Sequence, residues 1–460
     1  MRTRTSIAPA PPPEHQVEPL HRVPAGPVER ASGAAGDRAL GGLRERVDRA
    51  RGLFGRYPGQ YWLMVTGILI SNAGGSLVWP FLLIFASERL GLPLAAVGSL
   101  ITIQALAGMA SSFVAGTVAD RVGRKVVMAS SLAASGCVYL LFNGAHDYGS
   151  FALLMALFGM ANPLYQVGAD AMLADMIPSE RRAEAYAINR IASNTGFGLG
   201  PAVGGFLAAT SYALAFYGAA IGFLAYAVLV VVFARETLAR GGARAVRSAV
   251  AAGGRAAGGG YRAVFGDRRY VVFAALLSLG LIAPSTVWVL LAVYTKTNFG
   301  LPEYLYGWIP TVNAVMCVTV QLPVTRVTSR FRPLTVIAFG MAIYAAGAGS
   351  VAVMTSFAGF ALSMVVLTFG ELIVIPTASK YIADLAPSDL RGRYMSVYWL
   401  GWAASRAVAP LVGGFLNDRV GPSAIWYGAF GIGIASAIGL GLLVRGLRPL
   451  RRLGAGELAG

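Results

Sequence analysis

The chain has 460 residues, of which 56% are hydrophobic and 13% charged, and its formal net charge at pH 7 is +17. Soluble domains average about 45–50% apolar and about 25% charged residues, so this composition excludes an ordinary soluble domain and indicates lipid as the main solvent. Two cysteines and three histidines disfavour a disulfide framework, a metal centre and a histidine-based catalytic site. We expect the excess arginine in loops at a membrane surface, not in a nucleic-acid interface.

The N-terminal segment, residues 1–59, is polar and rich in Arg, Ala and Pro. This composition predicts a basic, disordered cytoplasmic tail, and no signal peptide is evident in it. Residues 37–56 are compatible with a basic amphipathic helix on the membrane surface, and a solvated tail is an equal alternative.

Twelve stretches are long and apolar enough to cross a bilayer as helices. Six form an expected N-terminal bundle over residues 60–234, and six form a C-terminal bundle over 270–445. Residues 235–269, rich in Gly, Ala and Arg, are the expected cytoplasmic linker, and residues 446–460 the cytoplasmic C-terminal tail. The expected spans are 61–86, 93–118, 125–143, 149–175, 185–210, 213–234, 270–295, 302–327, 333–354, 357–384, 394–418 and 422–445.

Basic residues are concentrated in alternate loops. If both termini are cytoplasmic, the outer loops hold only Arg89, Lys296 and Arg419, while the other loops and the linker hold many arginines. The positive-inside rule therefore predicts that both termini are cytoplasmic, which an even number of spans allows.

The two bundles are related by an internal repeat. Trp79 aligns with Trp288 at a shift of 209 residues, and at the same shift residues 204–207 (GGFL) align with residues 413–416 (GGFL). The longest matching stretch reads ADMIPSERR beside ADLAPSDLR. Parallel six-helix repeats with a site between them near the bilayer midplane are typical of transporters.

A motif after the second span, residues 116–125 (GTVADRVGRK), resembles the signature loop of the major facilitator superfamily. With the spans, the repeat and the linker, the resemblance covers about residues 57 to 445 and implies that superfamily's all-α membrane fold of 12 transmembrane helices. We expect Gly116 to permit close helix approach and Gly123 a tight turn. The resemblance implies that Asp120 holds the two bundles together near Arg393 and Tyr394, and that Arg124 meets Asp175. The alternative is that Arg121, Arg124 and Lys125 only set the topology; in the second half Ser329 replaces Asp120.

The fifth span resembles the antiporter motif of drug–proton exporters in this superfamily. The residues that carry this resemblance form a small-residue face with a proline bend, which suits a close helix contact. Plain packing is the alternative, and an echo at residues 410–414 (PLVGG) partly supports it; we favour export over import. The motif residues are Gly196, Gly200, Pro201, Gly204 and Gly205.

Ionisable residues within spans are functional candidates because charge is costly in a bilayer. Glu371 and Arg406 lie at nearly equal depth in spans ten and eleven, so we expect them to pair or to share a polar cavity and to couple proton binding to transport. A static structural pair and direct substrate contact are the alternatives. Asp170 and Arg190 are shallower and are expected to form a structural ion pair.

The central cavity is expected to involve Asn162 and Gln166, which share one helix face with Asp170. In the resembled superfamily spans one, four, seven and ten line the central path, which adds Asn72, Trp79, Trp288 and Glu371. Each of these residues is equally compatible with a helix–helix hydrogen bond or an interface anchor. Further candidates are Asn313, Gln321, Trp399 and Trp402.

The resemblance is to twelve-span bacterial multidrug-resistance exporters, although Met155 stands near the position of their usual span-four arginine and span one has no acid. We expect a monomeric secondary active transporter of the cell (plasma or inner) membrane that works by alternating access and exports a drug-like, amphipathic small molecule coupled to protons. A sugar, amino-acid or siderophore exporter or facilitator is the alternative. A membrane receptor or enzyme is disfavoured, and no cofactor, metal or nucleic acid is expected.

Overall fold

The computed structural model describes residues 55–237, 260–387 and 390–446. Within these ranges the chain is helical, with short connections and no β-strand. From Pro58 onward the chain forms one compact unit. The predicted amphipathic helix over residues 37–56, most of the N-terminal tail, most of the linker and the C-terminal tail lie outside the described residues.

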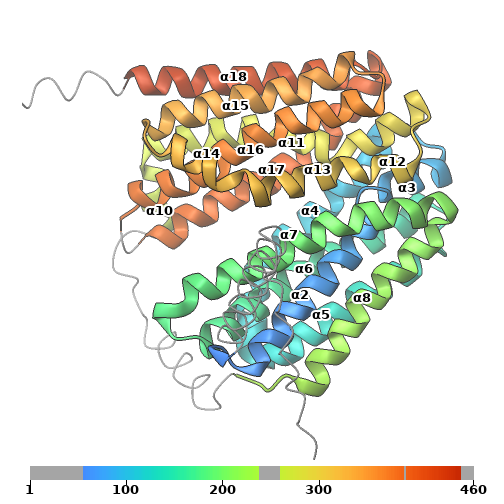
Figure 1. Cartoon of the computed structure of the whole chain (residues 1–460), viewed down its shortest axis with the longest axis vertical. Helices are drawn as coiled ribbons and strands as arrows, with labels where there is room; N and C mark the ends of the chain where they lie inside the picture. Colours follow the sequence, from blue (N-terminus) through green and yellow to red (C-terminus); the bar gives the residue numbers. More distant parts are fainter. Residues whose placement is uncertain (1–54, 238–259, 388–389, 447–460) are drawn as a thin grey trace, which may run out of the picture. The chain divides into compact units, whose positions relative to one another are not determined.

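Each of the first six predicted spans is helical (Figure 1). The first span is interrupted at Trp79–Phe81, where Pro80 lacks the N–H that a continuous helix needs. The other five spans are single helices. The elements are α2 (Gly59–Val78), α3 (Leu82–Leu90), α4 (Leu94–Val122), α5 (Arg124–Phe142), α6 (Tyr148–Met176), α7 (Ser179–Thr210) and α8 (Tyr212–Phe233).

The second six predicted spans are helical as well, and a short helix, α10 (Gly260–Gly266), precedes them within the predicted linker. The eighth span is broken into three pieces. The elements are α11 (Arg268–Phe299), α12 (Glu303–Tyr306), α13 (Trp308–Thr319), α14 (Gln321–Thr328), α15 (Pro333–Ser350), η1 (Val351–Val353), α16 (Phe357–Leu385), α17 (Arg391–Arg419) and α18 (Ala424–Gly446).

Nine helices of the described residues are long and apolar enough to cross a membrane, or ten if α12–α13 and α14 are one span bent by 57°. The helices α7 and α17 are also long enough to cross a membrane. They are not among the nine because charged and small residues make them less apolar. The all-helical membrane fold is therefore confirmed, whereas twelve crossings remain an inference.

The repeat is visible in how the helices begin and pack. Asp147 caps α6 by accepting from Ser150 N at 3.0 Å, and Ser356, 209 residues later, caps α16 by accepting from Gly359 N at 3.3 Å. The rings of Phe85 and Phe151 pack in the first half as those of their counterparts Tyr294 and Phe360 pack in the second. The two halves are thus built on one plan.

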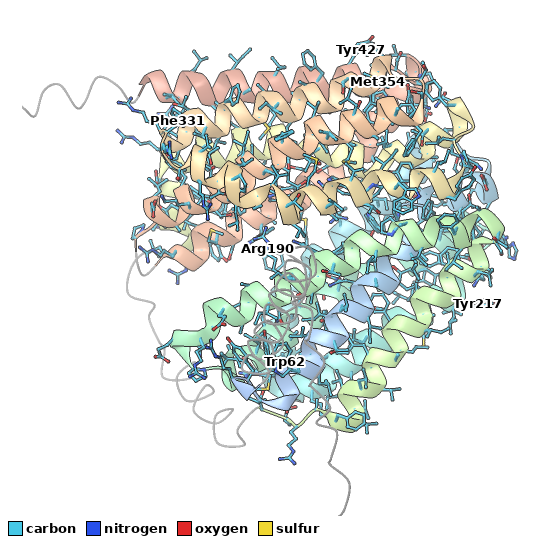
Figure 2. All side chains as sticks on the ribbon, viewed as in Figure 1. Trp62, Arg190, Tyr217, Phe331, Met354 and Tyr427 are labelled. Atoms are coloured by element: carbon cyan, nitrogen blue, oxygen red, sulfur yellow. The ribbon has the colours of Figure 1, made fainter. Side chains whose placement is uncertain are left out.

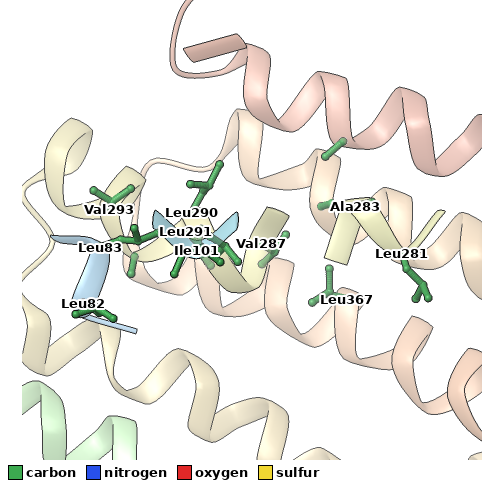
Figure 3. Close-up of a cluster of buried hydrophobic side chains, with 14 of the residues drawn as sticks. Leu82, Leu83, Ile101, Leu281, Ala283, Val287, Leu290, Leu291, Val293 and Leu367 are labelled. Carbon is green, nitrogen blue, oxygen red and sulfur yellow. The ribbon is translucent and has the colours of Figure 1, made fainter. Parts of the chain in front are cut away.

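An apolar cluster joins the two halves. Leu82 and Leu83 of α3 and Ile101 of α4 lie beside Leu290 and Leu291 of α11, all of them buried (Figure 3). We call this the contact end of the molecule, where α3 ends and α4 begins. We call the opposite end, with residues 116–125 between α4 and α5, the motif end.

Candidate functional site

At the contact end the halves meet along two seams, α7 against α12–α13 (first seam) and α17 against α4 (second seam). In the first seam a side chain on Gly307 would overlap the carbonyl oxygen of Pro201. In the second seam a side chain on Gly98 would meet the carbonyl oxygen of Pro410. Both pairs follow the shift of 209 residues, so the repeat found in the sequence is a repeated contact in space.

Further contacts in the seams obey the same rule. Thr311 Oγ1 donates to the carbonyl oxygen of Gly198 at 2.9 Å, and Thr102 Oγ1 donates to that of Ala407 at 2.6 Å. Gly205 lies against the backbone of residues 303–304, and Gly414 against that of residues 94–95. The predicted counterpart motifs therefore hold equivalent helix crossings.

Each seam also has a polar contact that its counterpart lacks. In the first seam Glu303, a buried residue, accepts from Tyr212 Oη at 2.6 Å and from Lys296 Nζ at 3.1 Å. In the second seam Asp418 accepts from Leu94 N at 3.2 Å and Ala95 N at 2.9 Å, at the start of α4. The sequence reasoning missed Glu303 and Asp418; an acid at or facing the first turn of a helix was the available signal.

The residues of the antiporter-like motif lie on two faces of α7 that pack against different neighbours. Gly196, Gly200 and Gly204 recur every four residues and lie directly against α2, where any Cβ would overlap backbone or Ser76. Pro201 and Gly205 face the first seam instead. These contacts support close packing, the alternative interpretation of this motif, whereas its predicted antiporter role stays a prediction.

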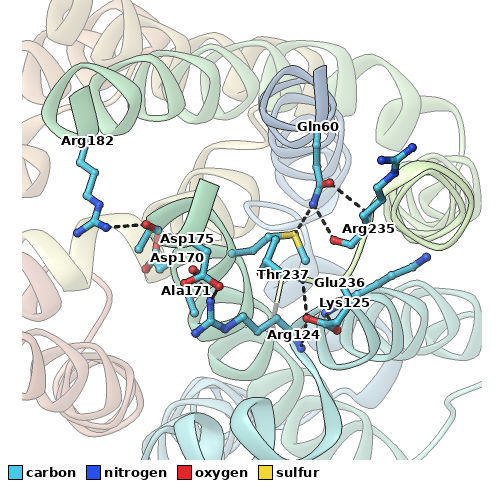
Figure 4. Close-up of polar contacts among 12 residues, drawn as sticks. Gln60, Arg124, Lys125, Asp170, Ala171, Asp175, Arg182, Arg235, Glu236 and Thr237 are labelled. Atoms are coloured by element: carbon cyan, nitrogen blue, oxygen red, sulfur yellow. Dashed lines mark hydrogen bonds and ion pairs between the residues drawn. The ribbon is translucent and has the colours of Figure 1, made fainter. Parts of the chain in front are cut away.

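The signature-like loop is held by acids (Figure 4). Gly123 has φ of +109°, so the predicted tight turn is confirmed. The predicted Arg124–Asp175 ion pair is also confirmed. The backbone N–H groups of Arg124 and Lys125, at the start of α5, donate to Glu236 at 3.3 and 3.0 Å. Glu236, an acid just beyond α8, was not predicted.

The predicted role of Asp120 is not realised in this conformation. Within the described ranges Asp120 and Arg121 make no hydrogen bond or ion pair, and Tyr394 Oη donates to Asp267 at 3.0 Å instead. A Cβ on Gly116 would meet no described residue within 4 Å, so none of the described helices packs closely against it. The prediction of close helix approach at Gly116 is therefore wrong for this conformation, in which the motif end is not latched through this loop.

Glu371 lies midway along α16, partly buried, and accepts from Asn313 Nδ2 at 2.8 Å. Asn313 also donates to Thr368 at 3.0 Å, which fixes its orientation. Arg190 of α7 lies within Coulombic range of Glu371, but the two side chains form no ion pair in this conformation. Figure 2 shows Arg190 between α7 and the second half. A carboxylate, an amide and a cation from both halves therefore share the centre of the molecule.

The predicted Glu371–Arg406 pair does not form. Ser405 Oγ donates to the carbonyl oxygen of Ser278, so this face of α17 packs on α11. Arg406, the next residue, is turned about 100° away along the helix and lies over the ring of Trp79 at 5.0 Å. Equal depth in the bilayer did not fix the direction in which the side chain points.

The predicted Asp170–Arg190 ion pair is also absent from the part of the chain that the structure describes, and both residues are exposed. Asn162 and Gln166 are exposed on the same face of α6 as Asp170. The remaining predicted cavity residues, Asn72, Trp79 and Trp288, are partly buried. The side chain of Asn72 donates to Ser193 at 2.9 Å.

The described residues contain no group of three or more His, Cys, Asp or Glu side chains that would hold a metal ion. The centre of the molecule contains the carboxylate of Glu371 and the amide of Asn313.

Comparisons with known proteins agree with this geometry. The family model of the Major Facilitator Superfamily matches residues 64–287 and 281–459. The uncharacterized MFS-type transporter YhjO of Bacillus subtilis (strain 168) is 26% identical over 380 residues, 81% of this chain and 90% of that protein. A Na(+), Li(+), K(+)/H(+) antiporter of Planococcus maritimus is 26% identical over 371 residues, 75% of this chain and 87% of that protein.

A shorter match is to the quinolone resistance protein NorA of Staphylococcus aureus (strain MRSA252), 31% identical over 173 residues, 37% of this chain and 44% of that protein. Among solved structures, a mutant of the nucleoside transporter NupG has a TM-score of 0.68 at 11% identity and covers 84% of this chain and 100% of that chain. The peptide transporter POT in complex with sulfate has a TM-score of 0.66 at 16% identity, with 84% and 94% covered. At these identities the structures support the fold alone.

Proposed function

Because this chain belongs to the Major Facilitator Superfamily and is a multi-pass transporter of the cell membrane, we propose that it is a twelve-span secondary active exporter of drug-like, amphipathic compounds, coupled to proton uptake. The helices α7 and α17 complete the count, since each lies along a helix that qualifies as a span (Figure 1). A helix held between membrane-spanning neighbours can cross a bilayer while carrying polar residues on its inner face.

Under the positive-inside rule, the arginine-rich loops support a cytoplasmic location for the motif end. The contact end then faces outward, closed by the two seams, while Asp120 makes no cross-half contact at the cytoplasmic end. This arrangement is the inward-open state of an alternating-access cycle. Closing the motif end and parting the seams would present the same centre to the outside.

The observation that carries the proposal is Glu371 at the centre between the halves, opposite Arg190. It is the single acid between Glu303 and Asp384 in the sequence. Arg190 provides a counter-charge to the carboxylate from the other half, so rocking of the halves changes what Glu371 faces. A proton bound from outside and released inside would then drive the opposite movement of solute. Glu371 keeps the proton-coupling role, with Arg190 in the place expected for Arg406.

The exposed polar stripe of Asn162, Gln166 and Asp170 supports a water-filled path beside this centre, because three polar groups on one membrane helix face are costly against lipid. Trp79, under Arg406, adds an aromatic surface. Aromatic and amide groups with few fixed charges favour a neutral or cationic amphipathic solute. The local match to a quinolone resistance protein supports the same class.

A second candidate is exchange of a monovalent cation for protons, favoured by the long match to the Planococcus maritimus antiporter. The carboxylate of Glu371 and the amide oxygen of Asn313 are hard oxygen ligands that suit such ions. The same carboxylate would then bind either the ion or the proton.

The test is transport by the full chain in proteoliposomes with an imposed pH gradient. The panel contains a quinolone, tetraphenylphosphonium, Na⁺ and K⁺. We expect Glu371→Gln to abolish gradient-driven accumulation of the transported compound while leaving counterflow exchange within about twofold of wild type, because only the protonatable group is removed. Asp384→Asn, an exposed acid at the end of the same helix, is the matched control and should behave as wild type.

The assignment of Glu371 fails if Glu371→Gln still accumulates the compound normally. Accumulation of Na⁺ or K⁺ without any organic compound would select the second candidate.

A further inference from the structure

An apolar groove of about 560 Å³ lies between α14 and α15 on the second half. Val336 and Ile373 are buried and form its floor, whereas Val327, Phe331 and Phe339 on its rim are 56%, 62% and 64% exposed. We call these five residues the α14–α15 groove. Figure 2 shows Phe331 at the opposite end of the second half from Met354 and Tyr427, so the groove opens at the motif end.

The groove results from the bend of the eighth span. The chain turns by 57° between Thr319 and Gln321, because Pro323 has no N–H for the carbonyl of Thr319 and its ring crowds that carbonyl. In the first half, the equivalent helix α4 continues unbroken to Val122 and packs against α5. The groove is therefore a departure from the repeat, not a feature of the shared scaffold.

Three arginines are adjacent in the chain to residues that line the groove. Arg326 precedes Val327 in the chain, and Arg330 and Arg332 flank Phe331. All three are exposed and form no ion pair within the described ranges. The sequence contains no acid between Glu303 and Glu371, so α13, α14, α15 and their connecting loops supply no carboxylate to pair with these arginines.

In the equivalent loop of the first half, acidic side chains contact the basic residues and the start of the following helix. There Arg124 is paired with Asp175, and Glu236 accepts from the backbone at the start of α5. At the position of Asp120 the second half has Ser329, so the loop has kept arginine and lost the acid. An uncompensated basic cluster beside an apolar groove is the pattern that binds an anionic lipid.

We propose that the α14–α15 groove binds one anionic glycerophospholipid of the phosphatidylglycerol type. An acyl chain lies along Val327, Val336 and Ile373, and the phosphate is held by Arg330 and Arg332, whose planar guanidinium groups match phosphate oxygens. The groove volume is within the range of about 300–1,000 Å³ found for pockets that hold drug-sized ligands. The proposal rests on the membrane location of the chain and not on the solute that it transports.

The test is binding of phosphatidylglycerol with a fluorescent acyl chain to the full-length protein in neutral detergent, measured by anisotropy. Unlabelled phosphatidylglycerol and phosphatidylcholine with identical acyl chains are the competitors. We expect one saturable site at which phosphatidylglycerol competes at least tenfold better. Each basic residue near an anionic group contributes about fivefold, so Arg330→Gln with Arg332→Gln should weaken binding about 25-fold and remove the headgroup preference.

Val327→Phe, which fills the groove, should weaken binding of both lipids. Arg391→Gln, another exposed arginine of the second half, and Val231→Phe, at a site that is 55% exposed, are the matched controls and should bind as wild type. Equal competition by the two lipids, or unchanged binding in the double arginine variant, would overturn the proposal. Weakening by Arg391→Gln as large as that of the double variant would also overturn it, since the attraction would then be general. The size-exclusion profile of each variant verifies folding. Transport measured in the double variant shows whether loss of lipid binding and loss of Glu371 function are separate effects.

Discussion

The contact end and the centre of this molecule differ in how they use the repeat. At the contact end, Thr311 and Gly198 repeat the contact of Thr102 and Ala407 at a shift of 209 residues. At the centre, the counterpart of Glu371 is Asn162 and that of Arg406 is Phe197. The repeat makes the two seams at the contact end equivalent helix crossings, so both can open and close together, whereas an asymmetric centre allows one carboxylate to bind one proton per cycle.

The largest effect is expected from breaking the seams. Gly205→Leu and Gly414→Leu each place a side chain against backbone of the other half, and overpacking of this kind costs about 1–3 kcal/mol. Closure at the contact end should weaken and transport should fall by about tenfold or more, to a similar extent in both variants. Gly431→Leu, at a helix position with open space, is the control. Initial transport rates in proteoliposomes measure the effect, and a large difference between the two seam variants would break the symmetry argument.

A smaller effect is expected at Asp418, which exists in one seam only. Asp418→Asn weakens the hydrogen bonds that the side chain accepts from the first N–H groups of α4. Ala209, the repeat counterpart of Asp418, has no side-chain acceptor. A helix cap contributes about 1 kcal/mol, so the population closed at the contact end should fall by about fivefold relative to the open one. Spin-label distances across the second seam measure this shift. Arg419→Gln is the control, and a shift in that variant of equal size would show that any local charge change suffices.

Asp120→Asn is expected to shift the equilibrium between the two conformations by a similar or smaller amount than Asp418→Asn, and in the opposite direction. Among the residues that the structure describes, Asp120 has no cross-half partner, so the substitution should leave this state intact and destabilise the state closed at the motif end. Loss of the negative charge at a helix start, about 0.3–1 kcal/mol, should raise accessibility of a cysteine placed at Gln166 to an impermeant maleimide by about twofold to fivefold. Both native cysteines are replaced first. Ser329→Ala, at the repeat position, should have no effect; reduced labelling in Asp120→Asn would contradict the latch.

The smallest effect concerns the two helix caps. Hydrogen bonds from Ser150 hold the pKa of the Asp147 carboxyl below its usual range, whereas its counterpart Ser356 does not titrate. Because this pKa is lowered by folding, the stabilisation is present above the ordinary carboxyl pKa and is lost as pH falls through the lowered one. Thermal unfolding should therefore be less pH-dependent below about pH 4 in Asp147→Ser than in wild type. Identical profiles would show that this cap does not contribute.

The positions of the helices and their repeat were predictable from the sequence, because both depend on apolar length and on residues that recur at one shift. Within the described residues each predicted span is helical, and nine or ten of them are long and apolar enough to cross a membrane. The constant shift identified residues that meet in equivalent crossings, because packing of small residues repeats with the scaffold. The Arg124–Asp175 pair came from the resemblance of one loop and is confirmed.

The side-chain pairings were predicted less well, because they depend on which way each helix faces. Glu371 and Arg406 share a depth but point to different neighbours, Asn313 and Trp79. Arg190 points to the second half and not to Asp170. The bend at Pro323 and the partners of Glu303 also depend on helices distant in sequence, so no local pattern revealed them.

The central claim is that Glu371 alone carries the coupling proton on a symmetric frame. The most direct measurement is the pH change when the transported compound, identified in the proteoliposome panel, is added to purified protein in weakly buffered detergent solution. The account predicts release of about one proton per bound molecule by wild type and by Asp384→Asn, and none by Glu371→Gln at saturating compound. Equal proton release by wild type and Glu371→Gln would contradict it.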